Sequence, residues 1–161
     1  MALRKIALEG ETCLSKVCRP VTDFNSRLHT LLDDLADTLA DSGGVGLAAP
    51  QVGILRRMVV IDVGDGLIEL INPEIIESEG EEIGVEGCLS VPGRRGTVKR
   101  PTKVVVRALD KKGREIELTA EGFLARAVCH ELDHLDGTVY VDKMIEDVTD
   151  QYNQEYHQEE N

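Results

Sequence analysis

The segment best suited to chemistry in this 161-residue chain is His130-Glu131-Leu132-Asp133-His134. Positions i and i+4 of a helix lie on one face, about 6 Å apart along the axis, so both imidazoles point to the same side. Two neutral imidazoles placed in this way form half of a tetrahedral site for a divalent metal. Glu131 lies beside them and could reach a metal-bound water as a general base, which is typical of metal-dependent hydrolases.

A catalytic metal of this kind needs a third protein ligand and an open position for water. The downstream candidates, which would give a metallopeptidase-type site, are Glu146, Glu155, His157 and Glu159. Upstream, Cys88 offers a thiolate, and Gly87 and Pro92 predict a loop around it. The spacing alone leaves Cys88 and a tail carboxylate as open alternatives. A structural metal, which needs a fourth protein ligand and no Glu131, is the non-enzymatic alternative.

Two predicted helices flank the middle of the chain. The first covers residues 25–40, where leucines recur at helical spacing, Asp23 or Asn25 can cap the start and Gly43-Gly44 marks the end. The second carries the two histidines: Thr119 can cap it, Glu121 falls in its first turn and Gly137 ends it. A third, weakly amphipathic helix is expected from Ile145 to Asn161.

The region between the two helices is rich in short aliphatic runs typical of strands. Residues 57–62 and 67–72 predict one hairpin, residues 74–83 a further strand, and residues 103–109 and 114–119 a second hairpin. A helix, then strands, then a helix indicates an α+β fold rather than alternating βαβ units. We expect one catalytic domain over residues 1–161, with a polar, acidic and fraying tail from about residue 146.

The glycine-rich run from Gly43 to Gly53 lacks the Lys-Ser/Thr ending of a phosphate-binding loop, so a nucleotide site is not favoured. Its glycines instead predict a backbone that comes very close to another group. The net charge also argues against a partner that carries phosphates. The chain has 30 acidic and 18 basic residues, and its net charge of −12 repels nucleic acid.

The composition also bears on location. No apolar run reaches the length of a membrane span, and no apolar stretch follows the N-terminal Met-Ala-Leu-Arg-Lys as in a secretory signal. The four cysteines, at positions 13, 18, 88 and 129, are expected to be reduced thiols. A soluble cytoplasmic protein that contacts neither membrane nor nucleic acid is therefore expected.

Three segments, taken together and in this order, resemble the peptide deformylases. They are Gly44-Val45-Gly46-Leu47-Ala48-Ala49-Pro50-Gln51, Glu86-Gly87-Cys88-Leu89-Ser90 and the His130–His134 motif. The resemblance covers the chain from about residue 5 to residue 145. It implies small antiparallel or mixed sheets around the helix of the His-Glu-x-x-His motif, with an N-terminal helix and a short C-terminal helix.

The resemblance also implies a reaction and a ligand set. Cys88, His130 and His134 would hold one ion per chain, Fe²⁺ natively and Ni²⁺, Co²⁺ or Zn²⁺ as substitutes. The reaction is removal of the N-formyl group from the formyl-methionine of nascent polypeptides, with release of formate, by attack of metal-bound water or hydroxide on the formyl carbon. Glu131 would act as general base and acid. The Gln51 amide and the Leu89 backbone N–H would stabilise the oxygen of the formyl group.

The remaining expectations concern the peptide and the ribosome. The residues expected to contact the substrate are Val45, Gly46, Glu86, Gly87, Arg95 and Ala127. Cys129 is expected to pack, and Asp133 and Asp136 to be surface charges that could also orient a ligand imidazole. Formyl-methionyl N-termini are the expected partners. The tail is acidic where some family members have a basic helix, so the sequence does not favour docking on ribosomal RNA through it.

Overall fold

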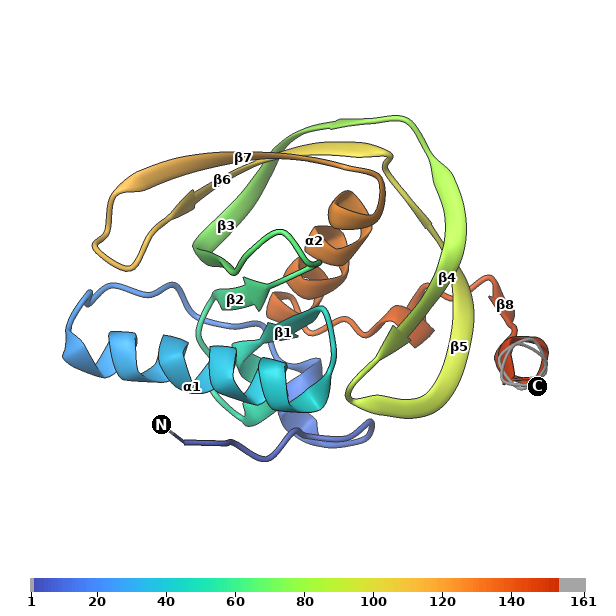
Figure 1. Ribbon diagram of the computed structural model, residues 1–161, viewed down its shortest axis with the longest axis horizontal. Helices are drawn as coiled ribbons and strands as arrows, with labels where there is room; N and C mark the ends of the chain where they lie inside the picture. Colours follow the sequence, from blue (N-terminus) through green and yellow to red (C-terminus); the bar gives the residue numbers. More distant parts are fainter. Residues whose placement is uncertain (1, 154–161) are drawn as a thin grey trace.

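The computed structural model describes residues 2–153 of the chain (Figure 1). Its helices are α1 (Ser26–Ser42) and α2 (Gly122–Leu135), with 3-10 turns at Thr12–Ser15, Ala49–Val52 and Tyr140–Asp142. Its strands are β1 (Gly46–Ala48), β2 (Met58–Ile61), β3 (Ile68–Glu79), β4 (Glu82–Cys88), β5 (Val91–Arg100), β6 (Lys103–Leu109), β7 (Glu115–Glu121) and β8 (Glu146–Asp147). Within residues 2–153, none of the helices is long and apolar enough to span a membrane.

The strands form two antiparallel sheets that lie on either side of α2. One sheet has the order β1-β2-β3-β6-β7 and the other has the order β4-β5-β8. The helix α2 packs against β1, β2 and β7 of the first sheet and against β5 of the second, so it occupies the centre of the molecule (Figure 1). The predicted α+β class, with small sheets around the motif helix, is confirmed.

Helix α1 forms because its leucines make a single apolar stripe. Leu28, Leu32, Leu35 and Leu39 are buried and pack with residues of β1 and β2. The side chain of Asn25 caps the helix by accepting a hydrogen bond from Leu28 N at 3.1 Å. Gly43 ends it with φ 73°, a conformation that glycine adopts without strain.

Two predictions about the strands and α2 were wrong. Residues 74–83 are not a separate strand: β3 continues to Glu79, pairs with β6 across bulges, and Gly80 (φ 73°) turns the chain into β4. Thr119 does not cap α2, because it lies inside β7 opposite Val105. The N-cap is Glu121, the last residue of β7, and its side chain makes no capping hydrogen bond.

Two predictions about irregular or helical segments were also wrong. Cys88 does not lie in a loop: β4 runs up to it, and the two-residue turn Leu89-Ser90 leads into β5, where Pro92 stands near the strand start. No helix begins at Ile145, because Glu146 and Asp147 form β8 and pair with Thr97 and Gly96 of β5. Residues 149–153 are helical, and residues 154–161 of the expected tail lie outside the described part.

Candidate functional site

The sulfur of Cys88 meets the two imidazoles of α2. The ligand atoms of Cys88, His130 and His134 all lie within 4.8 Å of one another, and Cys88 Sγ is 3.4 Å from His134 Nε2. Cys88 ends β4, whereas the histidines lie one turn apart on α2 with ring centroids separated by 5.1 Å. Of the alternative ligands, Glu146 is exposed in β8 outside this cluster, and Glu155, His157 and Glu159 lie outside the described residues.

Glu86 fixes the orientation of the His130 ring. Its Oε1 lies 2.9 Å from His130 Nδ1, which leaves Nε2 of that ring for the cluster. Arg100 donates two hydrogen bonds to the same carboxylate, both 2.9 Å, and Arg126 a third at 2.7 Å. Burial raises the pKa of Glu86, but the bonds from Arg100 and His130 outweigh it and lower that pKa to about 2. Glu86 is therefore a buried carboxylate that stays charged.

The donor set fits a divalent cation. Burial would lower the pKa of His130, but the charge of Glu131 and the hydrogen bonds with Cys88 and Glu86 raise it to about 10. His130 therefore lies where anionic groups converge, which favours a bound cation. Burial lowers the pKa of His134 to about 3, so this ring is neutral, as a ligand must be. One thiol and two imidazoles suit Fe²⁺, Ni²⁺, Co²⁺ or Zn²⁺.

Glu131 lies beside this cluster with a free oxygen. The residue is 3% exposed and its Oε1 has no hydrogen-bond partner among the described residues. Burial raises the pKa of Glu131 to about 7. A Cβ atom on Gly46 of β1 would collide with this carboxylate, which explains why the glycine run passes here: only glycine lets the strand approach the base so closely.

The amide of Gln51 has a fixed orientation. Its Oε1 accepts a hydrogen bond from Ala48 N at 2.9 Å, so its Nε2 must face the cluster. That nitrogen donates to Ser90 Oγ at 3.1 Å and lies 3.6 Å from Cys88 Sγ. Gln51 is buried in the 3-10 turn that follows β1, so the glycine-rich run and the Cys88 turn meet through this side chain.

A cavity of about 620 Å³ opens onto the cluster. The predicted site residues that line it are Val45, Gly46, Gln51, Glu86, Gly87, Cys88, Leu89, Arg95, Ala127, His130 and Glu131. His134 is fully buried behind them. The structure thus brings together the residues that the resemblance implied for the site, whereas Glu146 lies outside it and the other tail candidates lie outside the described residues.

Asp136 is an exposed charge, as expected, and pairs with Arg57. Asp133 is partly buried and pairs with Arg100 and Lys143. Within residues 2–153, neither carboxylate has a hydrogen bond to His130 or His134. Cys129 packs in the core as expected. The residues that the sequence analysis missed are Ser90, Arg100, Arg126 and Tyr140, whose ring stacks on His130 at 6.0 Å. Two of them carried a signal: Arg126 precedes His130 by one turn of the same helix, and Ser90 ends the Cys88 segment on which the resemblance rests.

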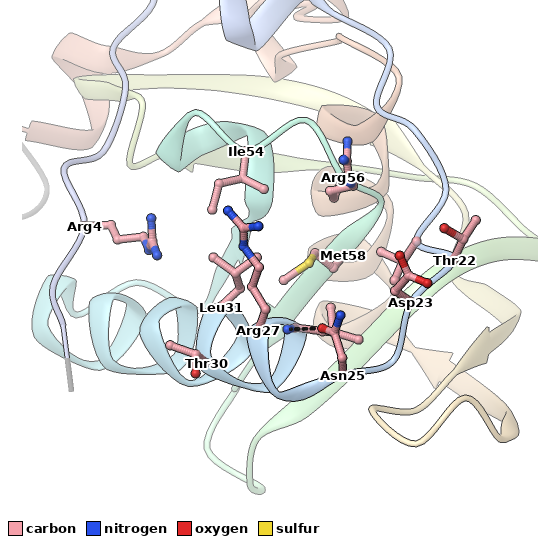
Figure 2. Close-up of a pocket in the computed structure, with 12 residues that line it drawn as sticks. Arg4, Thr22, Asp23, Asn25, Arg27, Thr30, Leu31, Ile54, Arg56 and Met58 are labelled. Carbon is pink, nitrogen blue, oxygen red and sulfur yellow. Dashed lines mark hydrogen bonds between the residues drawn. The ribbon is translucent and has the colours of Figure 1, made fainter.

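A second cavity, of about 760 Å³, lies between α1 and the Ile54–Met58 segment (Figure 2). Its charged lining residues are Arg4, Asp23, Arg27 and Arg56. In residues 2–153, the group with metal-ligand geometry is the Cys88 cluster, and none of its members lines this second cavity. The larger cavity is therefore not the candidate site. The metal-binding side chains that line the smaller cavity identify the site.

Comparison with known proteins identifies the family to which the chain is similar. The family model for polypeptide deformylase matches residues 3–150. The peptide deformylase of Caldanaerobacter subterraneus is 59% identical over 145 residues, which cover 90% of this chain and 91% of that protein. The one from Agathobacter rectalis is 56% identical over 158 residues, covering 96% of this chain and all of that protein.

Solved structures give the same result. A peptide deformylase from Legionella pneumophila superposes with a TM-score of 0.87 at 46% identity, covering 89% of this chain and 86% of that one. The enzyme from Thermotoga maritima superposes with a TM-score of 0.88 at 38% identity, covering 89% and 99%. The chain therefore belongs to the polypeptide deformylase family of enzymes.

Proposed function

We propose that this enzyme hydrolyses the N-formyl group of formyl-methionyl N-termini on new polypeptides in the cytoplasm and releases formate. The observation that carries the proposal is the convergence of Cys88, His130 and His134 beside the buried Glu131. These three residues would hold one divalent ion per chain, Fe²⁺ natively, with Ni²⁺, Co²⁺ or Zn²⁺ as substitutes. Such an ion, when bound, supplies a Lewis acid and lowers the pKa of water toward neutrality.

Glu131 moves the proton in this mechanism. Its carboxylate takes a proton from the attacking water and delivers it to the leaving amine nitrogen of methionine. A pKa of about 7, raised by burial, suits a group that must both accept and donate a proton near neutral pH. The unpartnered Oε1 is the atom that would carry this proton.

Gln51 and Leu89 would stabilise the charge that develops on the formyl oxygen. The Gln51 amide is held by Ala48 so that its Nε2 donors face the site before substrate arrives. Leu89 follows directly after Cys88 in the tight turn and lines the same cavity as Gln51. Donors that are already in place need no reorganisation during the reaction.

The cavity would bind the formyl-methionine. Val45 and Ala127 would supply apolar wall for the methionine side chain, and Gly46 and Gly87 line the same cavity beside them. Arg95 at the rim would bind the peptide further along. Glu86 lines the cavity as well, but its carboxylate is engaged by His130 and two arginines, so we propose that it orients His130 rather than binding peptide.

Formate release tests the proposed function. Protein loaded with Fe²⁺ under anaerobic conditions should release one formate per formyl-Met-Ala-Ser peptide, measured by a coupled formate assay. The acetylated peptide should react at least about 100-fold more slowly, because a tight pocket that excludes one methyl group discriminates on this scale. Equal rates for the two peptides, or cleavage inside the peptide chain as by a metallopeptidase, would overturn the proposal.

Replacing Glu86 by Gln should weaken metal binding by about 10- to 100-fold, since the His130 ring loses the carboxylate that orients it and raises its basicity. The variant should also be less stable, because Arg100 and Arg126 lose their shared counter-charge in the interior. Competition with a metal chelator measures the affinity. The matched control is Glu82→Gln, an exposed glutamate of the same strand, which should bind metal like the wild type. Unchanged affinity in Glu86→Gln would contradict the assignment.

A further inference from the structure

The N-terminal segment of the chain is hydrogen-bonded to two turns that carry site residues. Ala7 N donates to the backbone oxygen of Gln51 at 2.7 Å, and Glu9 N donates to the backbone oxygen of Ser90 at 2.8 Å. In Figure 1 this segment runs below α1 toward the turn between β4 and β5. One short stretch of backbone, residues 7–9, therefore contacts both turns, and we call it the N-terminal strap.

The two turns belong to different sheets. Gln51 lies in the 3-10 turn that follows β1 of the five-stranded sheet. Ser90 lies directly after Leu89, in the turn between β4 and β5 of the three-stranded sheet. The Gln51 side chain also joins the two turns, because its Nε2 donates to Ser90 Oγ at 3.1 Å. The strap therefore completes a closed ring of hydrogen bonds, from Ala7 to Gln51, from Gln51 to Ser90 and from Ser90 back to Glu9.

The strap is anchored on both sides. Before it, Arg4 N donates to Thr38 Oγ1 at 3.0 Å, and the Arg4 guanidinium pairs with the buried Asp34 of α1 at 2.9 Å. After it, the side chain of Leu14 is buried in the same apolar cluster as that of Ala7. Because these anchors lie on either side of residues 7–9, the strap cannot move away from the two turns without losing buried contacts.

The turn at the end of the strap fits type II geometry. Glu11 N donates to Leu8 O at 3.0 Å, and Gly10 has φ 98°. Glu9 has a negative φ, since Asn72 is the one non-glycine residue with a positive φ within residues 2–153. A negative φ at the second position and a positive φ at the third define a type II turn, which accepts proline at its second position. Proline at position 9 would therefore keep the turn and remove only the N–H that binds Ser90.

We propose that the N-terminal strap positions the two donors for the formyl oxygen, by fixing the turn that carries the Gln51 amide relative to the turn that carries the Leu89 N–H. This inference rests on the proposed function and deepens it, because it names what holds the donors of the same site. Donors to a developing charge act only when they are already in place, so a small shift of one turn weakens them. The two strap bonds go to Gln51 and Ser90 rather than to a metal ligand, so their loss lowers kcat and leaves metal binding unchanged.

The test compares Glu9→Pro, which lacks the backbone N–H, with Glu9→Ala, which keeps it. In Glu9→Pro, kcat on formyl-Met-Ala-Ser should fall about 5- to 30-fold, a fraction of the roughly 10²- to 10³-fold lost when an oxyanion donor is removed outright. KM and metal per chain should stay within about twofold of the wild type, because the change affects the transition state. Glu9→Ala loses only an exposed ion pair with Arg94, so it should keep at least about half of the wild-type kcat.

A double-mutant cycle shows whether the effect passes through the donors for the formyl oxygen. On a Gln51→Ala background, adding Glu9→Pro should lower kcat by a smaller factor than it does in the wild type, because groups that act as a unit are not additive. Four results would overturn the inference: wild-type kcat in Glu9→Pro, an equal loss in Glu9→Ala, a full additional loss on the Gln51→Ala background, or a loss of metal that accounts for the loss of activity.

Hydrogen exchange on the wild-type protein tests the strap without a substitution, and so applies even if Glu9→Pro does not fold. The backbone amides of Ala7 and Glu9 should exchange as slowly as those of β1, because a strap that positions the site must stay bonded to it. Exchange as fast as that of an exposed loop would overturn the inference. Failure of the wild type to release formate from formyl-Met-Ala-Ser, with both amides protected, would instead overturn the proposed function.

Discussion

Replacing Glu131 by Gln is expected to lower kcat by a factor of about 10³ to 10⁴ while the metal content stays at one ion per chain. General acid–base groups contribute on this scale, and Gln can neither take the proton from water nor return it to the leaving amine. The amide has the same shape as the carboxylate, so the close packing against Gly46 is preserved. Formate release and metal analysis on the same sample measure the two quantities.

The control for this variant is Glu121→Gln, which alters an exposed glutamate immediately before α2 that makes no capping bond. It should retain wild-type kcat. Turnover by Glu131→Gln above about a tenth of the wild-type rate would show that another group moves the proton. Loss of metal from that variant would show that Glu131 contributes to the metal site itself.

Replacing Cys88 by Ser is expected to release the metal almost completely, with loss of formate release in the same sample. A serine hydroxyl is a far weaker ligand than a thiolate, and two imidazoles alone leave the ion half coordinated. Metal per chain after dialysis against a weak chelator measures the effect. Cys13→Ser is the matched control, since Cys13 is a half-buried thiol that packs near the site without joining the ligand cluster. Full occupancy in Cys88→Ser would contradict the ligand assignment.

The features that could be predicted from the sequence depend on residues close together in the chain. They are the periodic recurrence of apolar residues and the spacing of particular side chains along a helix or turn. The leucines of α1 and the 130–134 pair share a helical face whatever the tertiary structure, so both could be predicted from the chain alone. The hairpin of β6 and β7 has a turn at residues 110–113 with Gly113 at φ 81°, again a local signal. The third metal ligand could not be predicted in this way. Spacing alone did not distinguish Cys88 from the tail carboxylates, and only the resemblance to a family favoured Cys88.

The features that could not be read depend on contacts between distant segments. Glu86 meets Arg100 across a hairpin and Arg126 and His130 across the interface with α2, so no window of sequence contains the network. Cys88 was expected in a loop because of Gly87 and Pro92, but pairing with β5 outweighs these weak local preferences. Residues 146–147 became a strand for the same reason, because β5 offers an edge there.

The central claim, that the sulfur of Cys88 and the imidazoles of His130 and His134 bind one ion, is tested most directly by the absorption spectrum of the Co²⁺-loaded protein. A thiolate ligand should give a sulfur-to-cobalt charge-transfer band in the near ultraviolet, and a tetrahedral site should give intense visible bands. Both should appear up to one equivalent of Co²⁺, persist in Cys13→Ser and disappear in Cys88→Ser. A weak spectrum typical of six oxygen or nitrogen ligands, or one that survives in Cys88→Ser, would contradict the account.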